Sequence, residues 1–136
     1  MTRHEFDIPG YGWHVRAFYD VTPEEADEVI QAVIDNGCQM KAAAEAYDLI
    51  ASGRPEVGFT HPNYKTSNMV VAVSRTQTAS DFYNTLQHEI FHIVSFIAKS
   101  CGLNPYGERV CYLAGDISQR MFVACHKYLC DRCRNI

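Results

Sequence analysis

The sequence predicts an α+β fold, a compact domain with a small three-stranded sheet, antiparallel or mixed, and helices packed against it. Short segments of alternating apolar residues near the N-terminus and in the middle of the chain are typical of strands. Longer segments with apolar residues at helical spacing lie between and after them. The 136 residues, 47% of them hydrophobic, fit one core. We therefore expect residues 1–136 to form a single domain.

The N-terminal elements are predicted from alternation and from helix-start signals. Alternation predicts a strand over 13–20, after the turn-prone residues 9–12. A helix is expected after Thr22-Pro23-Glu24-Glu25, because Thr is a good N-cap and Pro suits the first helical position. Asn36-Gly37 ends it, and a second helix is expected from about Cys38 to Ala51.

The second half begins with two short predicted strands, at about 57–60 and 68–74. Thr78-Ala79-Ser80-Asp81 resembles a capping box and opens a helix predicted to run through Ser100. Residues 102–105 break that helix, and a last helix is expected over about 105–128. The predicted order is strand, helix, helix, two strands, helix, helix.

The motif His88-Glu89-Ile90-Phe91-His92 lies within the first of these C-terminal helices. Residues i and i+4 lie on one face of a helix, so His88 and His92 can hold one zinc ion. Glu89 then lies beside the metal, where its carboxylate can take a proton from water. The motif predicts a catalytic zinc site.

A catalytic zinc site needs a third protein ligand, and the following helix offers two acids on one side, Glu108 and Asp116. Glu108 is favoured because it lies just after the turn, near the start of the returning helix. A simple hairpin count opposes this choice, since it sets His92 level with a residue near Tyr112. Asp116, the type of ligand that aspzincins use, therefore stays as the alternative.

His88-Glu89-x-x-His92 followed by Glu108-x-x-Cys111-Tyr112 resembles the gluzincin clan of metallopeptidases. The layout is similar to the minimal single-domain gluzincin-like proteins of bacteria and phages, and more loosely to the peptidases that cut phage repressors. The resemblance covers residues 68–112 and hardly extends to the first 55 residues. It implies a zincin-like domain in which an active-site helix precedes a ligand-bearing helix. One zinc ion would be bound by His88, His92 and Glu108, with Glu89 as general base.

The resemblance also bears on the residues around this site. Gluzincins often have Asp or a small polar residue four positions after the ligand Glu, and this chain has Tyr112 there. The resemblance therefore does not identify the group that orients a ligand His, for which Asp116 is a candidate. Tyr112 is a candidate donor to the oxyanion of the reaction. Strand 68–74 would be the edge strand along which a peptide or protein substrate lies. A plain core strand is the alternative, because Val71 and Val73 are apolar.

The six cysteines are expected to be thiols, because no signal peptide precedes them. Cys130-Asp131-Arg132-Cys133 is a CxxC near the chain end, preceded by Cys125. Segment 125–136 is interpreted as an incidental tail. The alternatives are a second metal site, a disulfide, or a blocking tail whose thiolate occupies the open zinc position. The sequence does not assign a role to these three cysteines.

Charge and hydropathy exclude two classes of partner. The net charge is −4 and the basic residues are scattered, which argues against nucleic acid. No apolar stretch is long enough to span a membrane, and the N-terminus has no apolar segment after a basic start, so a cytoplasmic protein is expected.

The motif and its surroundings predict a zinc-dependent metallopeptidase in which Glu89 activates a zinc-bound water. The first alternative is a latent or non-catalytic zinc-binding regulator of a bacterial or phage mobile element. The second is an interaction protein without metal, whose His88 and His92 are buried and hydrogen-bonded. Cleavage specificity, pathway and oligomeric state have no signal in the sequence.

Overall fold

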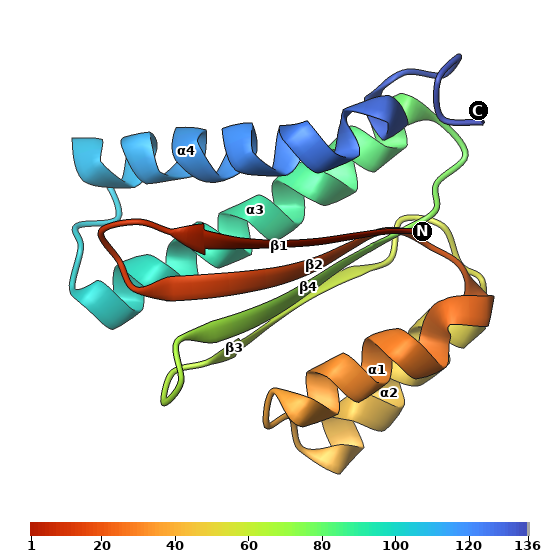
Figure 1. The fold of residues 1–136 in the computed structure, drawn as a ribbon, viewed down its shortest axis with the longest axis horizontal. Coiled ribbons are helices and arrows are strands. Elements are labelled where there is room, and N and C mark those ends of the chain that lie inside the picture. The colour runs from red at the N-terminus through yellow and green to blue at the C-terminus, as the bar shows by residue number, and fades with distance from the viewer. Residues whose placement is uncertain (136) are drawn as a thin grey trace.

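A computed structural model describes residues 1–135 of the chain, with one four-stranded sheet between two layers of helices (Figure 1). The elements in chain order are β1 (Thr2–Ile8), β2 (Trp13–Val21), the 3₁₀ helix η1 (Pro23–Glu25), α1 (Ala26–Asp35), α2 (Met40–Ala51), β3 (Gly58–Asn63), β4 (Asn68–Ser74), α3 (Ala79–Cys101), α4 (Glu108–Cys125) and the 3₁₀ helix η2 (His126–Leu129).

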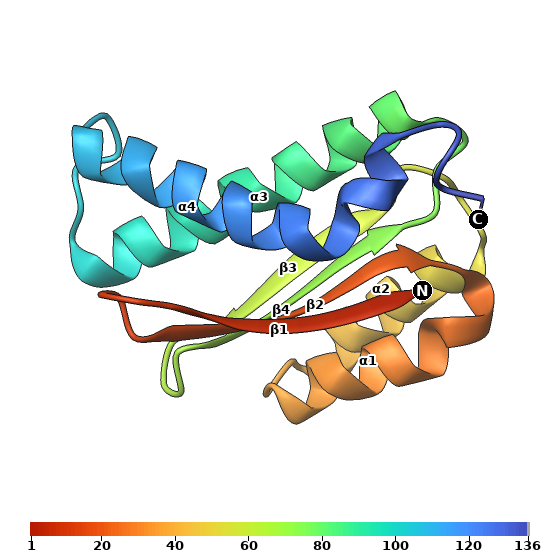
Figure 2. The ribbon, with the colours of Figure 1, turned by 45° about the horizontal axis from the view of Figure 1, so that its top comes forward.

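The sheet has the strand order β1-β2-β4-β3. β1 and β2 form one antiparallel hairpin, and β3 and β4 form another. The two hairpins meet in a parallel pairing of β2 with β4, in which Ala17 lies opposite Val71. Helices α3 and α4 cover one face of the sheet, and α1 and α2 cover the other (Figures 1 and 2). The α+β class and the mixed sheet are therefore confirmed.

Two expectations about the sheet are wrong. It has four strands rather than three, because β1 was not predicted: only Phe6 and Ile8 of this polar segment are buried. Strand 68–74 is not an edge strand, since β4 pairs with β2 on one side and with β3 on the other. Both faces of β4 are also covered, which explains its nearly continuous apolar sequence. β3 is the edge strand of this half of the sheet.

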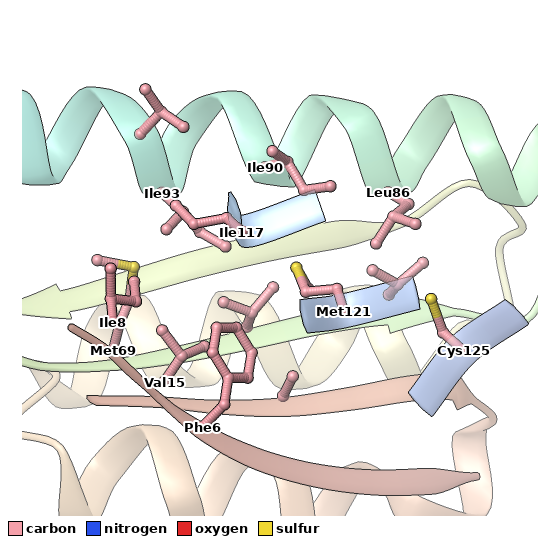
Figure 3. Packing of buried hydrophobic residues seen from close by; sticks show 14 of the residues in the cluster. Phe6, Ile8, Val15, Met69, Leu86, Ile90, Ile93, Ile117, Met121 and Cys125 are labelled. Atoms are coloured by element: carbon pink, nitrogen blue, oxygen red, sulfur yellow. The ribbon is translucent and has the colours of Figure 1, made fainter. Parts of the chain in front are cut away.

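Each face of the sheet has its own core. Val15, Val71 and Val73 belong to the cluster under α3 and α4, whereas Phe18 and Ala72 belong to the cluster under α1 and α2. Figure 3 shows the first cluster, in which Leu86, Ile90 and Ile93 of α3 and Ile117 and Met121 of α4 approach side chains of the sheet. α3 is thus fixed rigidly over β4 and β3.

The ends of α3 follow the sequence signals. Thr78 is its N-cap, and the Thr78 side chain accepts a hydrogen bond from the backbone N–H of Asp81 at 3.1 Å. Gly102, with φ of 67°, ends the helix in the left-handed conformation that glycine adopts without strain. α4 is shorter than predicted, because the chain tightens into η2 after Cys125. The helix expected after Thr22 begins as η1 and continues as α1.

Candidate active site

His88 and His92 lie on the flank of α3 that faces the β3 edge. Their Nε2 atoms are 3.1 Å apart and their rings are 4.8 Å apart. A zinc ion binds imidazole nitrogen at about 2.0–2.1 Å, so two nitrogens in a tetrahedral shell lie about 3.3 Å apart. The histidine pair therefore has the spacing of two ligands of one metal ion, and the sequence prediction that they share a helix face is confirmed.

An aromatic row supports His92 from the neighbouring turn and from the β3–β4 hairpin. The Phe96 ring stacks on the His92 ring, with centroids 5.9 Å apart and planes 16° apart. Tyr64 meets Phe96 edge-on at 6.4 Å, and Trp13 meets Tyr64 edge-on at 5.9 Å. These contacts restrict the rotation of His92, as the groups around a metal ligand commonly do.

Glu89 is buried between α3 and β3, with 2% of its surface exposed. The Thr60 hydroxyl donates a hydrogen bond to Glu89 Oε1 at 2.9 Å. Burial raises the pKa of the Glu89 carboxyl above its ordinary value of 4.5, and the Thr60 hydrogen bond and nearby His88 and His92 oppose that rise. A carboxyl with a raised pKa beside two imidazoles is the combination expected of a general base.

Glycine at position 58 allows β3 to approach Glu89 closely. A Cβ atom at Gly58 would lie 2.8 Å from Glu89 Oε2 and 2.9 Å from Thr85 Cγ2, closer than real Cβ contacts. The absence of a side chain at Gly58 therefore leaves the space that the Glu89 carboxylate occupies.

A hollow of about 190 Å³ opens beside this carboxylate. It is larger than the roughly 30 Å³ that one water molecule occupies, so water can reach the site. The residues that line it are Glu56, Gly58, Asn84, Thr85, His88 and Glu89. His88 and the buried Glu89 carboxylate thus line one hollow that is large enough for water.

The outer edge of β3 is open to an added strand. The backbone N–H of Ser74 donates to the Val57 carbonyl at 2.9 Å, and residues of an antiparallel strand alternate between facing their partner and facing away from it. The backbone groups of Gly58 and Thr60 therefore point away from β4. The edge strand proposed for a substrate thus has its counterpart in β3 rather than in β4.

The structure does not bring Glu108 or Asp116 to the histidine pair. α4 lies toward the β1 edge of the sheet (Figure 2), where Arg109 stacks on Tyr11 and Tyr128 hydrogen-bonds Thr2. His88 instead lines a hollow with Gly58 of β3. Asp116 pairs with Arg120 at 2.9 Å. Within residues 1–135, no group of three or more His, Cys, Asp or Glu side chains could hold a metal ion.

The remaining predicted residues also lie away from the motif. Tyr112 is 75% exposed on α4. Cys125 is buried in the core, so its thiol does not lie open to a zinc ion. Sequence reasoning missed Gly58, Thr60 and Phe96. Only Phe96 had a signal, an aromatic residue one helical turn after His92.

Comparisons with protein-family models, with curated proteins and with solved structures found no match for this chain. No helix formed by residues 1–135 is long and apolar enough to cross a membrane. A functional assignment therefore depends on the residues around the motif.

Proposed function

We propose that this protein is a zinc-dependent metallopeptidase in which His88 and His92 bind one zinc ion and Glu89 is the general base. The observation that supports this most directly is the 3.1 Å approach of the two Nε2 atoms beside a buried carboxylate. Bound zinc would supply Lewis-acid chemistry, which polarises a carbonyl and makes water acidic near neutral pH.

Glu89 moves the proton in this proposal. Its Oε1 accepts the Thr60 hydrogen bond, which leaves Oε2, on the Gly58 side, to take a proton from water. The raised pKa helps the carboxyl keep that proton long enough to pass it to the leaving amine. The Thr60 hydrogen bond keeps the Glu89 carboxylate in one orientation during this proton transfer.

An extended peptide is the substrate that the site favours. It would pair with the outward backbone groups of Gly58 and Thr60 as an added strand. That position lies beside His88 and Glu89, because Gly58 lines the same hollow as these two residues. The motif, the open edge and the hollow then serve one reaction.

The third zinc ligand must come from outside the motif. Glu108, which the gluzincin resemblance implies, must then move to the β3 side of α3. Glu56 is the second candidate, because this residue lines the same hollow as His88. A loop residue can deliver a carboxylate with less movement than a packed helix can.

Elemental analysis of purified protein separates these ligands. We expect about one zinc per chain in the unmodified protein and none after His88→Ala. Loss of zinc with Glu108→Ala alone would establish the gluzincin ligand set, and loss with Glu56→Ala alone would establish the loop ligand. Loss with Asp116→Ala alone would establish the ligand type that aspzincins use. A folded chain that binds no zinc even when zinc is added would overturn the proposal.

A zinc-binding regulator that does not cut peptides is the second candidate function. Glu89 is only 2% exposed and already holds a hydrogen bond, a state that also suits a purely structural carboxylate. Hydrolysis of an unfolded protein such as casein, abolished by a chelator and restored by zinc, favours the peptidase. Tight zinc binding without hydrolysis favours the regulator.

A further inference from the structure

The segment Cys130-Asp131-Arg132-Cys133 forms a tight turn after η2. The Cys130 carbonyl accepts hydrogen bonds from the backbone N–H groups of Cys133 and Arg134, both at 3.1 Å. A turn closed by such a bond keeps its first and fourth Cα atoms within about 7 Å. A disulfide needs Cα atoms about 4.4–6.8 Å apart, so this backbone can accept a bond between the two cysteines with little change.

The two thiols differ in reactivity. The side chain of Cys133 and the backbone N–H groups of Cys133 and Arg132 lower the pKa of Cys130. The side chain of Cys130 in turn raises the pKa of Cys133. Both side chains are partly exposed. An attacking thiol that ionises readily beside a protonated partner is the arrangement that thiol–disulfide exchange uses.

The turn is also fixed to the rest of the fold. The Asp131 side chain accepts a hydrogen bond from the backbone N–H of Ala79 at 2.8 Å, at the first residue of α3. The Arg134 guanidinium hydrogen-bonds the Thr76 carbonyl. Because these anchors lie on both sides of Cys133, this part of the turn is held against the start of α3.

We propose that Cys130 and Cys133 form a reversible dithiol–disulfide site whose oxidant is a low-molecular-weight disulfide. The Cys130 thiolate attacks one sulfur of the oxidant, forming a mixed disulfide and releasing the first thiolate. Cys133 then gives its proton to solvent and attacks the Cys130 sulfur. The Cys130–Cys133 bond forms and the second thiolate leaves, so the protein loses two electrons and the oxidant gains them.

Glutathione redox buffers of increasing oxidised fraction test this site in the full chain. After an acid quench and alkylation, mass spectrometry counts free thiols and maps cross-links. We expect two of the six cysteines to be lost together, with the link mapped to Cys130 and Cys133 and reversed by excess reduced glutathione. Cys133→Ser should stop at one glutathione on Cys130, since the resolving thiol is gone.

Cys101→Ser is the matched control, because Cys101 is more exposed than either member of the pair and lies at the opposite end of α3 from the turn. This variant should keep the paired loss of two thiols. Glutathione attached first to Cys101 or Cys111, or six free thiols in fully oxidised buffer, would overturn the proposal. Neither result depends on zinc or on hydrolysis, so this site is tested separately from the proposed peptidase.

Discussion

The two flanks of α3 differ in chemistry although they belong to one helix. The flank toward β3 carries His88, Glu89 and His92 beside a water-accessible hollow. The flank toward α4 is closed by apolar side chains such as Ile90 and Val94. Spacing along the helix determines which residues share a flank, whereas the connection after α3 determines which flank α4 covers. The motif therefore determines the local arrangement of His88, Glu89 and His92, and the topology determines which other elements lie beside them.

Replacement of Glu89 by Gln is expected to have the largest effect on the β3 flank. The glutamine side chain keeps the shape of glutamate and can still accept the Thr60 hydrogen bond, but it cannot take a proton. We expect peptide hydrolysis to fall by about 10²–10⁴-fold with zinc content unchanged. Turnover and elemental analysis on the same preparation measure both. Full activity in this variant would remove Glu89 from the mechanism.

Truncation of Ile93 is the corresponding test of the core side of α3. Ile93 is fully buried in the cluster of Figure 3, so Ile93→Ala should lower the free energy of unfolding by about 2–5 kcal/mol. Phe91→Ala, on a side chain that is 72% exposed, should change it by less than about 0.5 kcal/mol. Urea denaturation measures both, and equal effects would contradict the burial described for α3.

Substitution of Gly58 tests how closely β3 packs against Glu89 and Thr85 of α3. The added methyl of Gly58→Ala meets Glu89 and Thr85, which must move, at an expected cost of about 1–3 kcal/mol in unfolding free energy and with reduced hydrolysis. Gly115→Ala is the matched control. Nothing lies within 4 Å of its added Cβ on α4, so it should stabilise the protein by about 0.5–1 kcal/mol.

The pH dependence of stability is the smallest effect we expect. The pKa of Glu89 is higher in the folded chain than its ordinary value of 4.5, so the folded state binds more protons between these two pKa values. The contribution of Glu89 to unfolding free energy therefore falls as pH rises above 4.5. Thr60→Val should extend this fall to higher pH, because the Thr60 hydrogen bond lowers the pKa of Glu89.

The Glu89→Gln variant is the control for that titration. Its side chain stays neutral, so the same pH range should show a flatter stability curve and a more stable protein at neutral pH. Denaturation at several pH values measures the two curves. Identical curves for the unmodified chain and for Glu89→Gln would contradict a raised pKa at this position.

Most of the fold was predictable because its long elements carry strong local signals. The capping residue Thr78, the period of apolar residues in α3 and the break at Gly102 determine that helix without help from the rest of the chain. β1 lacked such a signal, since its polar residues become ordered only by pairing with β2. The central place of β4 was hidden for a similar reason, because strand order depends on contacts between distant segments.

The site was predictable only where its residues are neighbours in sequence. His88, Glu89 and His92 lie within about one helical turn, so the motif itself places them together. Thr60 and Gly58 come from a strand far from the motif in sequence, and only the packing of α3 on β3 brings them to Glu89. A hairpin count also could not predict which side of α3 faces Glu108 and Asp116. Such a count aligns residues along two helices, but it does not give the direction in which each residue points around the helix axis.

The parallel seam between β2 and β4 bears on how the chain folds. Each hairpin of the sheet joins strands that are close in sequence. The pairing of β2 with β4, in contrast, forms only when the whole stretch from Thr22 to Ser67 has closed into a loop. Loop-closure entropy opposes that step, and contacts of long sequence separation slow folding. We expect the meeting of the two hairpins to limit the folding rate. The β3 edge would then become ordered with its hairpin, before the sheet is complete.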